Sequence, residues 1–106
     1  MGIDLVDISR FERFTDSHDA FLVKVFTPSE LAYCFTFKEP KSHLAGIFAC
    51  KEAASKALGI HEYPFALLEV LHDDNGKPEI FYQGKKMSVA VSITHTDTVA
   101  AAIAAL

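Results

Sequence analysis

Apolar and acidic residues alternate at the start of the chain. In GIDLVDI (2–8) the apolar side chains are separated by Asp4 and Asp7, a pattern that predicts a short β-strand. The next residues, RFERF (10–14), predict the beginning of a short helix and bring two arginines close together. The chain therefore opens with a strand that leads into a local concentration of positive charge.

Two further helices are expected before the middle of the chain. TPSE (27–30) is a helix start, because the threonine can cap it, the proline suits its first position and the glutamate completes a capping box. We expect this helix to run to about Phe37, where KEPK (38–41) breaks the pattern. A longer helix is predicted over about 42–58, and Gly59 is well placed to end it.

The second half of the chain changes to the period of strands. ALLEVLH (66–72) and PEIFYQ (78–83) flank DDNGK (73–77), whose Asn-Gly pair is a strong signal for a hairpin turn. MSVAVSIT (87–94) alternates again, and TVAAAIAAL (98–106) can pair with it across the turn HTD. A strand, then helices, then an antiparallel meander predict an α+β fold.

Length, composition and charge narrow the class of protein. With 106 residues, 50% of them hydrophobic, the chain has the size of one domain, residues 1–106, and its apolar excess hints at a subunit interface. A net charge of −4 argues against binding along the phosphate backbone of nucleic acids. The two cysteines have no metal-type spacing, and neither a targeting segment nor a membrane-spanning run is evident. We therefore expect a cytoplasmic protein, either free or as a domain of a larger one.

The predicted long helix contains an unusual group of charged residues. Within FACKEAASKALGI (48–60), Glu52 and Lys56 share a helix face, whereas Lys51 and Ser55 lie on a neighbouring face. A solvated ion pair between Glu52 and Lys56 is one interpretation. The surrounding residues are small and apolar, however, which favours a helix packed on more than one side. A carboxylate in that setting needs a cation or a metal as its partner.

A magnesium site is the alternative interpretation. If strand 2–8 packs beside this helix, Asp4 and Glu52 could face each other, and two close carboxylates repel unless a proton or a divalent cation lies between them. Magnesium suits such a pair, because it binds one or two carboxylates and completes its coordination with phosphate oxygens and water. Lys56, one turn away, could then reach the same phosphate.

Five motifs along the chain carry a family resemblance. GIDLVDISR, FTPSEL, LAGIFACKEAASKALG, NGKP and SITHT, in this order, resemble the holo-acyl-carrier-protein synthase family, the small 4′-phosphopantetheinyl transferases. The resemblance spans Gly2 to Thr96. It implies magnesium-dependent transfer of phosphopantetheine from coenzyme A to a serine of an apo-acyl carrier protein, with release of 3′,5′-ADP, a reaction of fatty acid biosynthesis and lipid metabolism.

The resemblance also implies roles for individual residues. It puts magnesium on Asp4 and Glu52 and sets Lys56 near the coenzyme A pyrophosphate, and these three are the expected catalytic residues. Because the reaction is an attack on phosphorus, catalysis would be mainly positioning and charge neutralisation. The proton of the carrier serine could pass to Asp4, directly or through a metal-bound water, or to Glu52, and the sequence leaves this choice open.

The same resemblance implies a homotrimer with active sites at subunit boundaries, in which the C-terminal meander supplies the contacts. Gly59, His95 and Thr96 are expected, together with Lys56, to bind coenzyme A, with His95 in the same subunit or across the boundary. Without the resemblance, His95 reads as a turn histidine between two strands.

Arg10 and Arg13 are the expected docking residues for the acyl carrier protein. Carrier proteins of this kind are acidic, so a local basic helix face could steer them, and Lys24 could extend it. Arg10 matches a basic position that follows the first strand in the family, whereas Arg13 is placed by proximity and charge. The alternative is a pair of surface arginines that serve only the neighbouring acidic side chains Asp7 and Glu12.

Two departures from the family pattern motivate a second functional hypothesis. The family usually reads LAGRFAAKEA, so Ile47 replaces an arginine that would be expected to help hold a coenzyme A phosphate. The family also continues SKALGTG, whereas this chain reads SKALGIHE and has His61 at the second glycine. The alternative to the transferase is thus a non-catalytic trimeric module that binds coenzyme A or a carrier protein.

The remaining chemistry-bearing residues give weaker signals. Apart from His95, the histidines (His18, His43, His61 and His72) show no zinc spacing. Cys50, next to Lys51, could be a thiol with a lowered pKa, but a small buried apolar side chain is the favoured interpretation.

Overall fold

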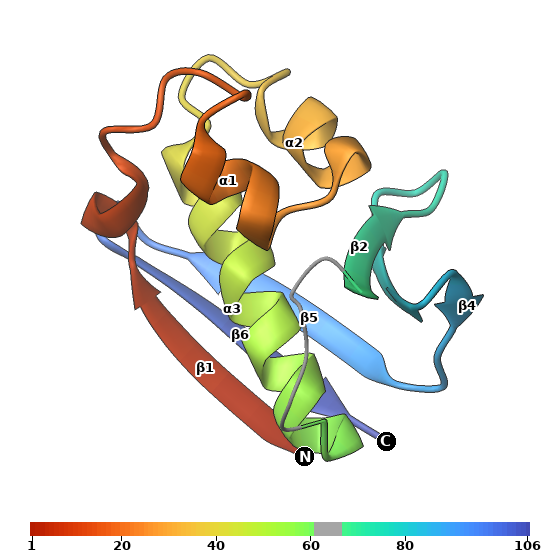
Figure 1. Ribbon diagram of the computed structural model, residues 1–106. Helices are drawn as coiled ribbons and strands as arrows, with labels where there is room; N and C mark the ends of the chain where they lie inside the picture. Colours follow the sequence, from red (N-terminus) through yellow and green to blue (C-terminus); the bar gives the residue numbers. More distant parts are fainter. Residues whose placement is uncertain (61–66) are drawn as a thin grey trace.

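The computed structural model describes residues 1–60 and 67–106 (Figure 1). The elements in chain order are β1 (Gly2–Asp7), the 3₁₀ helix η1 (Ile8–Phe11), α1 (Ala20–Val25), α2 (Pro28–Cys34), α3 (Lys41–Leu58), β2 (Leu68–His72), β3 (Pro78–Tyr82), β4 (Lys85–Lys86), β5 (Ala90–His95) and β6 (Val99–Ala105). This confirms the predicted α+β class and the long central helix.

The strands form two antiparallel sheets. One has the order β1-β6-β5 and the other β2-β3-β4. The predicted hairpin between β2 and β3 and the predicted pairing of β5 with β6 are both present. The first strand also pairs with the last, with Asp4 opposite Ala102, a partner that the sequence pattern did not assign. The meander therefore divides between the two sheets, and the strand expected over 87–94 begins at Ala90.

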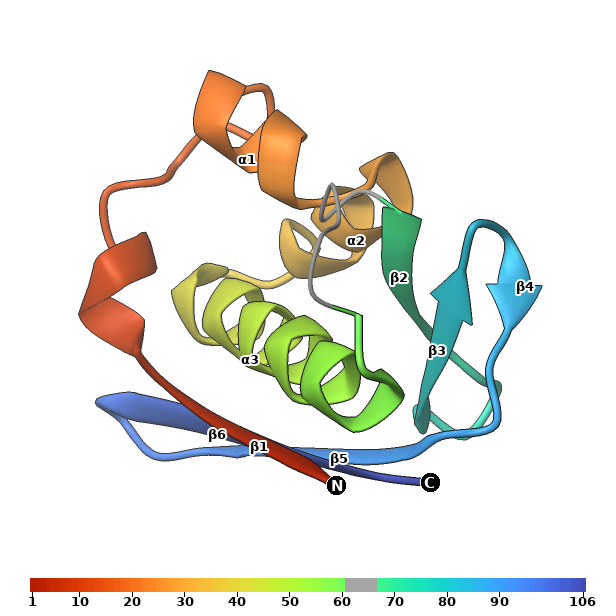
Figure 2. The same ribbon diagram turned by 60° about the horizontal axis from the view of Figure 1, so that its bottom comes forward.

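The helix α3 occupies the centre of the molecule. Figure 2 shows it lying on the β1-β6-β5 sheet, with α1 and α2 on its other side and the second sheet at its flank. Small side chains permit the close approach: a Cβ at Gly2 would overlap the carbonyl oxygen of Ala53, and one at Gly46 would come within 3.0 Å of Ile93. The expectation of a helix packed on more than one side is confirmed.

Capping chemistry explains where the short helices begin and end. The capping box of α2 is present: Thr27 Oγ1 accepts the N–H of Glu30, and Glu30 Oε1 accepts the N–H of Thr27. This helix ends at Cys34, not near Phe37 as predicted. Just beyond its end the Thr36 hydroxyl donates to the Tyr33 carbonyl at 2.6 Å, a local bond that competes with helix continuation.

The region before α2 differs most from expectation. The helix predicted to begin within 10–14 is instead the 3₁₀ turn η1, which starts at Ile8 because Ile8 and Phe11, three residues apart, point to the same buried side. The helix α1 was not predicted. Its N-cap is Asp19, whose carboxylate accepts the N–H of Phe21 at 2.9 Å.

The end of α3 follows the sequence prediction. Gly59 has φ +71°, a left-handed conformation that favours glycine, and the N–H of Ile60 donates to the carbonyl of Ser55 at 2.9 Å. His61 and the first residue of the strand expected over 66–72 lie outside the described residues.

Candidate active site

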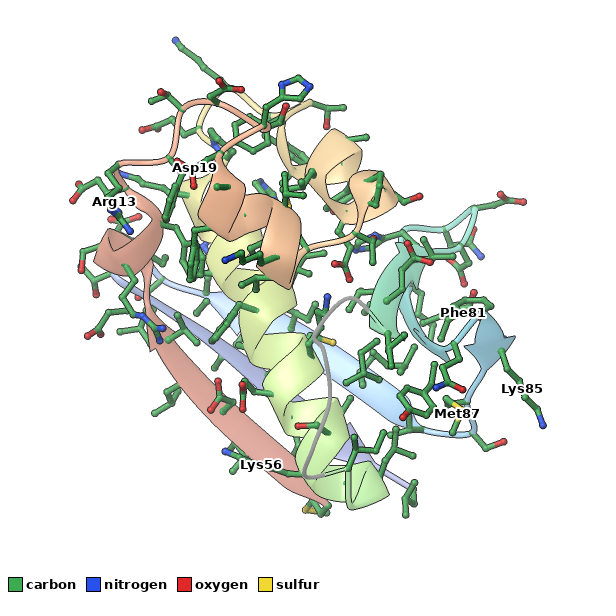
Figure 3. The ribbon with its side chains drawn as sticks, viewed as in Figure 1. Arg13, Asp19, Lys56, Phe81, Lys85 and Met87 are labelled. Atoms are coloured by element: carbon green, nitrogen blue, oxygen red, sulfur yellow. The ribbon has the colours of Figure 1, made fainter. Side chains whose placement is uncertain are left out.

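Lys56 and Asp4 meet between α3 and β1. The Lys56 ammonium donates to the backbone carbonyl of Ile3 at 2.9 Å and lies 3.3 Å from the Asp4 carboxylate. The Asp4 side chain is mostly covered and that of Lys56 is half exposed. Figure 3 shows Lys56 extending from the last turn of α3 towards β1. The expected approach of this strand to the alanine-rich helix is therefore present, and it brings two of the three predicted catalytic residues together.

Glu52 lies one turn before Lys56 on α3 and is half-buried. The strand β1 runs antiparallel to α3, because Gly2 packs on Ala53 and Lys56 whereas Arg10, beyond the strand, reaches the ring of Phe48. Asp4 belongs to the helix-facing side of β1, where every second residue is covered. This register sets Asp4 alongside the turn of α3 that carries Glu52.

The donor set of this region fits magnesium. Carboxylate oxygens are the protein ligands that this ion prefers, and it commonly takes only one or two of them, filling its other positions with phosphate and water oxygens. No cluster of three or more metal-binding side chains occurs within the described residues. The Lys56 side chain is half exposed, so its ammonium is accessible from solvent.

His95 and Thr96 lie at the other end of α3. His95 ends β5, which is separated from β1 by β6, and its ring is 6.3 Å from that of His43 in the first turn of α3. Lys56 is in the last turn of this 18-residue helix, so the two regions are roughly 20 Å apart along its axis. The structure does not bring His95 and Thr96 to Lys56 within one chain.

Thr96 shapes the turn between β5 and β6. Its N–H donates to the carbonyl of Val99 at 2.8 Å, and its hydroxyl oxygen accepts the N–H groups of Thr98 and Val99. The carbonyl of Thr96 lies 3.0 Å from His95 Nδ1, so that nitrogen carries the hydrogen and Nε2 is directed elsewhere. The turn thereby fixes the His95 ring at the rim of a pocket.

That pocket has a volume of about 440 Å³ and opens beside the first two turns of α3. His43 and Ile47 contribute from the helix, His72 from β2, Lys77 from the hairpin and His95 from β5. Ile47, at the position of the family arginine, is buried in its wall. Sequence reasoning missed this grouping, since the histidines come from separate elements and have no common spacing.

Arg10 and Arg13 are both exposed at the η1 end of the molecule. The Arg10 guanidinium lies 5.1 Å from the Phe48 ring centroid, and that of Arg13 lies 4.5 Å from the centroid of Phe14. Figure 3 shows Arg13 on the outer surface, on the opposite side of the molecule from Lys85. The charged ends thus remain available to a partner, while the rings beneath them hold the side chains in place.

Lys51 lies in the protein interior and pairs with a buried carboxylate. Its ammonium is fully buried and lies 2.8 Å from Glu30, which is also fully buried. It also donates to the carbonyl of Val25 at 2.9 Å, and the second oxygen of Glu30 accepts the N–H of Val70. Lys51 therefore joins α3 to α1, α2 and β2 and belongs to the interior, away from Asp4. A lysine within a run of apolar residues was the available sequence signal.

Cys50 is not a reactive thiol. It is completely buried, and burial raises its pKa to about 12, as it does for Cys34. Both cysteines are free thiols. The interpretation of Cys50 as a small buried side chain is confirmed.

Comparison with known proteins identifies the family. The family model described as 4′-phosphopantetheinyl transferase superfamily matches residues 1–105. The holo-[acyl-carrier-protein] synthases of Moorella thermoacetica and Chlorobaculum parvum are 37% and 39% identical to the chain. These alignments cover 97% and 98% of the chain and 89% and 94% of the relatives.

Similarity to solved structures indicates the same family. The Helicobacter pylori holo-[acyl-carrier-protein] synthase in complex with coenzyme A has a TM-score of 0.82 at 32% identity, covering 98% of this chain and 96% of that one. The Bacillus anthracis enzyme in complex with CoA (3′,5′-ADP) has a TM-score of 0.77 at 33% identity, covering 95% and 89%.

The fold and these matches define a phosphopantetheinyl transferase, an enzyme. Within that superfamily the chain belongs to the holo-acyl-carrier-protein synthase family, which confirms the resemblance carried by its motifs. In the part of the chain that the structure describes, no helix is long and apolar enough to cross a membrane.

Proposed function

We propose that the protein transfers 4′-phosphopantetheine from coenzyme A to a serine of an apo-acyl carrier protein, in a magnesium-dependent reaction that releases 3′,5′-ADP. The observation that carries the proposal is the contact of Lys56 with Asp4 beside the turn that holds Glu52. A cation and two carboxylates at a partly exposed contact between strand and helix suit a pyrophosphate and its metal. Relatives solved with coenzyme A or 3′,5′-ADP add support.

Each residue of this site would have a separate role in the reaction. Asp4 and Glu52 would hold magnesium, which when bound supplies charge neutralisation and polarisation at the pyrophosphate. Lys56 would move from Asp4 to a pyrophosphate oxygen and stabilise the charge that develops on the leaving group. A carboxylate oxygen of Asp4 or Glu52 would accept the proton of the carrier serine. Both assignments of the base remain part of the proposal.

A homotrimer with shared sites accounts for the separation of the predicted coenzyme A ligands. Lys56 and Gly59 are at one end of α3, and His95 and Thr96 are at the other. We propose that coenzyme A is held between Lys56 of one subunit and His95 of the partner subunit. The sheet face that points away from α3 supports subunit contact, because it exposes large apolar side chains, namely Ile3, Leu5 and Ile103.

The acyl carrier protein would dock at the η1 end of the molecule through Arg10 and Arg13. Phe21 is exposed and stacks on Phe14 at 5.5 Å, beside Arg13, and Lys24 is exposed in the last turn of the same helix, α1. A cationic surface with an exposed aromatic ring suits an acidic helical partner. Because the whole protein is acidic, this attraction would act over a short range.

The decisive experiment mixes the purified protein with apo-acyl carrier protein, coenzyme A and magnesium, and follows the carrier by intact-mass spectrometry. A magnesium-dependent gain of the phosphopantetheine mass is expected. A folded oligomer that binds coenzyme A but modifies none of several carriers would favour the non-catalytic module, which Ile47 motivates. Light scattering on the same sample tests the trimer separately.

A further inference from the structure

The pocket at the start of α3 has an unusual set of walls. It brings together three histidines from three elements, His43, His72 and His95, with Lys77 from the hairpin. No aspartate or glutamate occurs among the described residues that line it. The lining also includes three hydroxyl side chains, those of Tyr33, Ser42 and Ser92. A concave site of this size with cationic and hydroxyl donors suits an oxyanion, and a phosphate monoester in particular.

Stacked rings hold two of the histidines in fixed orientations. His72 stacks on Tyr33 with centroids 4.0 Å apart, and His43 stacks on Phe37 at 3.5 Å. Within the described parts of the chain, neither of these imidazoles has a hydrogen-bond partner for its ring nitrogens. Their faces are therefore occupied while their nitrogens remain available to a ligand.

The charges that face these imidazoles set their protonation in the free protein. Burial lowers the pKa of His43, and the nearby His95 and His72 lower it further. Burial also lowers the pKa of His72, opposed by the Asp73 carboxylate in the adjoining hairpin. Tyr33, from α2, adds no charge, since its pKa is raised further by burial, and Lys77 adds positive charge from the hairpin. His43 and His72 are therefore mostly uncharged near neutral pH.

We propose that this pocket binds a phosphate monoester dianion with uptake of a proton by His43 or His72, so that affinity rises as the pH falls. The sign follows from linkage: a dianion favours the charged imidazole, the bound state holds more protons than the free state, and binding therefore strengthens on acidification. The buried wall at Ile47 offers no permanent charge, which leaves the imidazoles and Lys77 to balance the phosphate.

The occupant would be the phosphorylated nucleotide end of coenzyme A, and in this respect the inference rests on the proposed function. It adds that the transferase takes up its donor more tightly in mildly acidic solution. The gain in affinity is expected only down to about pH 6.5. Below that, the phosphate monoester itself takes up a proton, with a pKa of about 6, and loses its dianionic charge. A ligand that titrated alone would bind more weakly at low pH, which is the opposite sign.

The test is calorimetric titration of the full-length protein with 3′,5′-ADP between about pH 8 and pH 6.5, in two buffers of different ionisation enthalpy. The expected result is an affinity gain of about three- to tenfold, with proton uptake that approaches one per site. The double variant H43N/H72N should flatten this dependence. H18N is the matched control, because His18 is exposed and lies outside the pocket, and it should retain the full dependence.

The outcomes separate the two proposals. Binding that is independent of pH and buffer in the unmodified protein overturns the inference without recourse to any variant. A dependence that persists in H43N/H72N overturns the assignment to these histidines, and no binding of 3′,5′-ADP overturns the pocket as its site. Transfer to a carrier, measured at about pH 8 on the same preparation, tests the proposed function independently. Active transfer together with an affinity for 3′,5′-ADP that does not change with pH would reject the proton linkage and leave the proposed function in place.

Discussion

The Lys51 ammonium and the Glu30 carboxylate form an ion pair 2.8 Å apart that is completely enclosed by protein. The charged groups of both residues are also hydrogen-bonded to the backbone. Glu30 accepts backbone N–H groups of Thr27 and Val70, and Lys51 donates to the carbonyl of Val25. A buried pair of this kind is tolerated only with such complete hydrogen bonding, since each charge has lost its water. The helix that carries the candidate active site is thus fixed to three neighbouring elements.

Removal of one partner should destabilise the protein strongly. We expect K51M to lower the free energy of unfolding by about 3–5 kcal/mol, because Glu30 would remain buried without its cation. Urea unfolding followed by circular dichroism measures the change. The double variant E30Q/K51M should lose less stability than the sum of the losses measured for K51M and E30Q separately, because it leaves no isolated buried charge. Additive effects would show that the two charges are not coupled.

Neutralisation of either carboxylate should nearly abolish transfer without unfolding the protein. For D4N or E52Q we expect transfer to fall by about 100-fold or more, on the order of 3 kcal/mol of transition-state stabilisation. The Asp4 and Glu52 side chains are partly exposed, so the folded state tolerates the amides. Carrier modification by mass spectrometry and light scattering give the two readouts. Turnover retained in both variants would eliminate the magnesium-pair hypothesis.

Charge reversal at the η1 end should affect the carrier and not coenzyme A. R10E is expected to raise the KM for the acyl carrier protein by about tenfold, roughly 1.4 kcal/mol, because a repulsive charge replaces an attractive one. Affinity for coenzyme A should stay within error. K85E is the matched control, since Lys85 is exposed on the opposite side of the molecule. Equal effects of the two variants would argue for a general change in charge.

Added bulk at Gly2 should separate β1 from α3. A Cβ at this residue would overlap the Ala53 carbonyl oxygen and come within 2.9 Å of Lys56 Cβ, so G2A should cost about 1–3 kcal/mol. The shift of Asp4 away from Lys56 should also lower turnover. Thermal unfolding and initial rates, measured together, test this explanation. A variant with the stability and activity of the parent would show that the contact is not close in solution.

The two cysteines should resist thiol reagents while the protein is folded. Burial holds the pKa of Cys34 and Cys50 at about 12, above the usual value for a thiol of about 8.5. The folded state therefore favours the protonated form. The associated stability is complete below about pH 8.5 and is lost as the pH rises through about 12. Labelling at pH 8 should be slow in buffer and rapid in denaturant, and fast labelling of the native protein would contradict this.

Local patterns predicted the local parts of the fold. The apolar period and Gly59 predicted α3, the Asn-Gly pair predicted the first hairpin, and the alternation of 87–94 with 98–106 predicted the last. The pairing of β1 with β6 was beyond reach, because it joins segments at opposite ends of the chain and no local signal specifies it. The helix α1 was missed because AFLVKV has a single polar residue, Lys24, and therefore no amphipathic period, and because Asp19 was not recognised as its N-cap.

In the candidate site, too, local features were predicted and those that depend on tertiary packing were missed. The motif of Asp4, Glu52 and Lys56 was available from residue types and spacing, and the approach of Asp4 to Lys56 agrees with it. The Lys51–Glu30 pair was missed because each residue had a local explanation, one as part of a helix face and the other as a cap. The histidine pocket depends on how two sheets are placed around α3, which is a property of tertiary packing and not of any one segment.

The strand that carries Asp4 precedes α3 and all the other described strands in the chain, yet its neighbour in the sheet, β6, follows them. Until β6 emerges, the polar edge of β1 has no partner within its own sheet, and α3 has only part of the surface on which it lies. Closure of such a distant pairing is slow relative to helix formation. A ribosome-bound partial chain that ends before β6 therefore has the charged groups of the candidate site without the complete sheet that aligns them, and we expect transfer activity only after β6 has paired with β1.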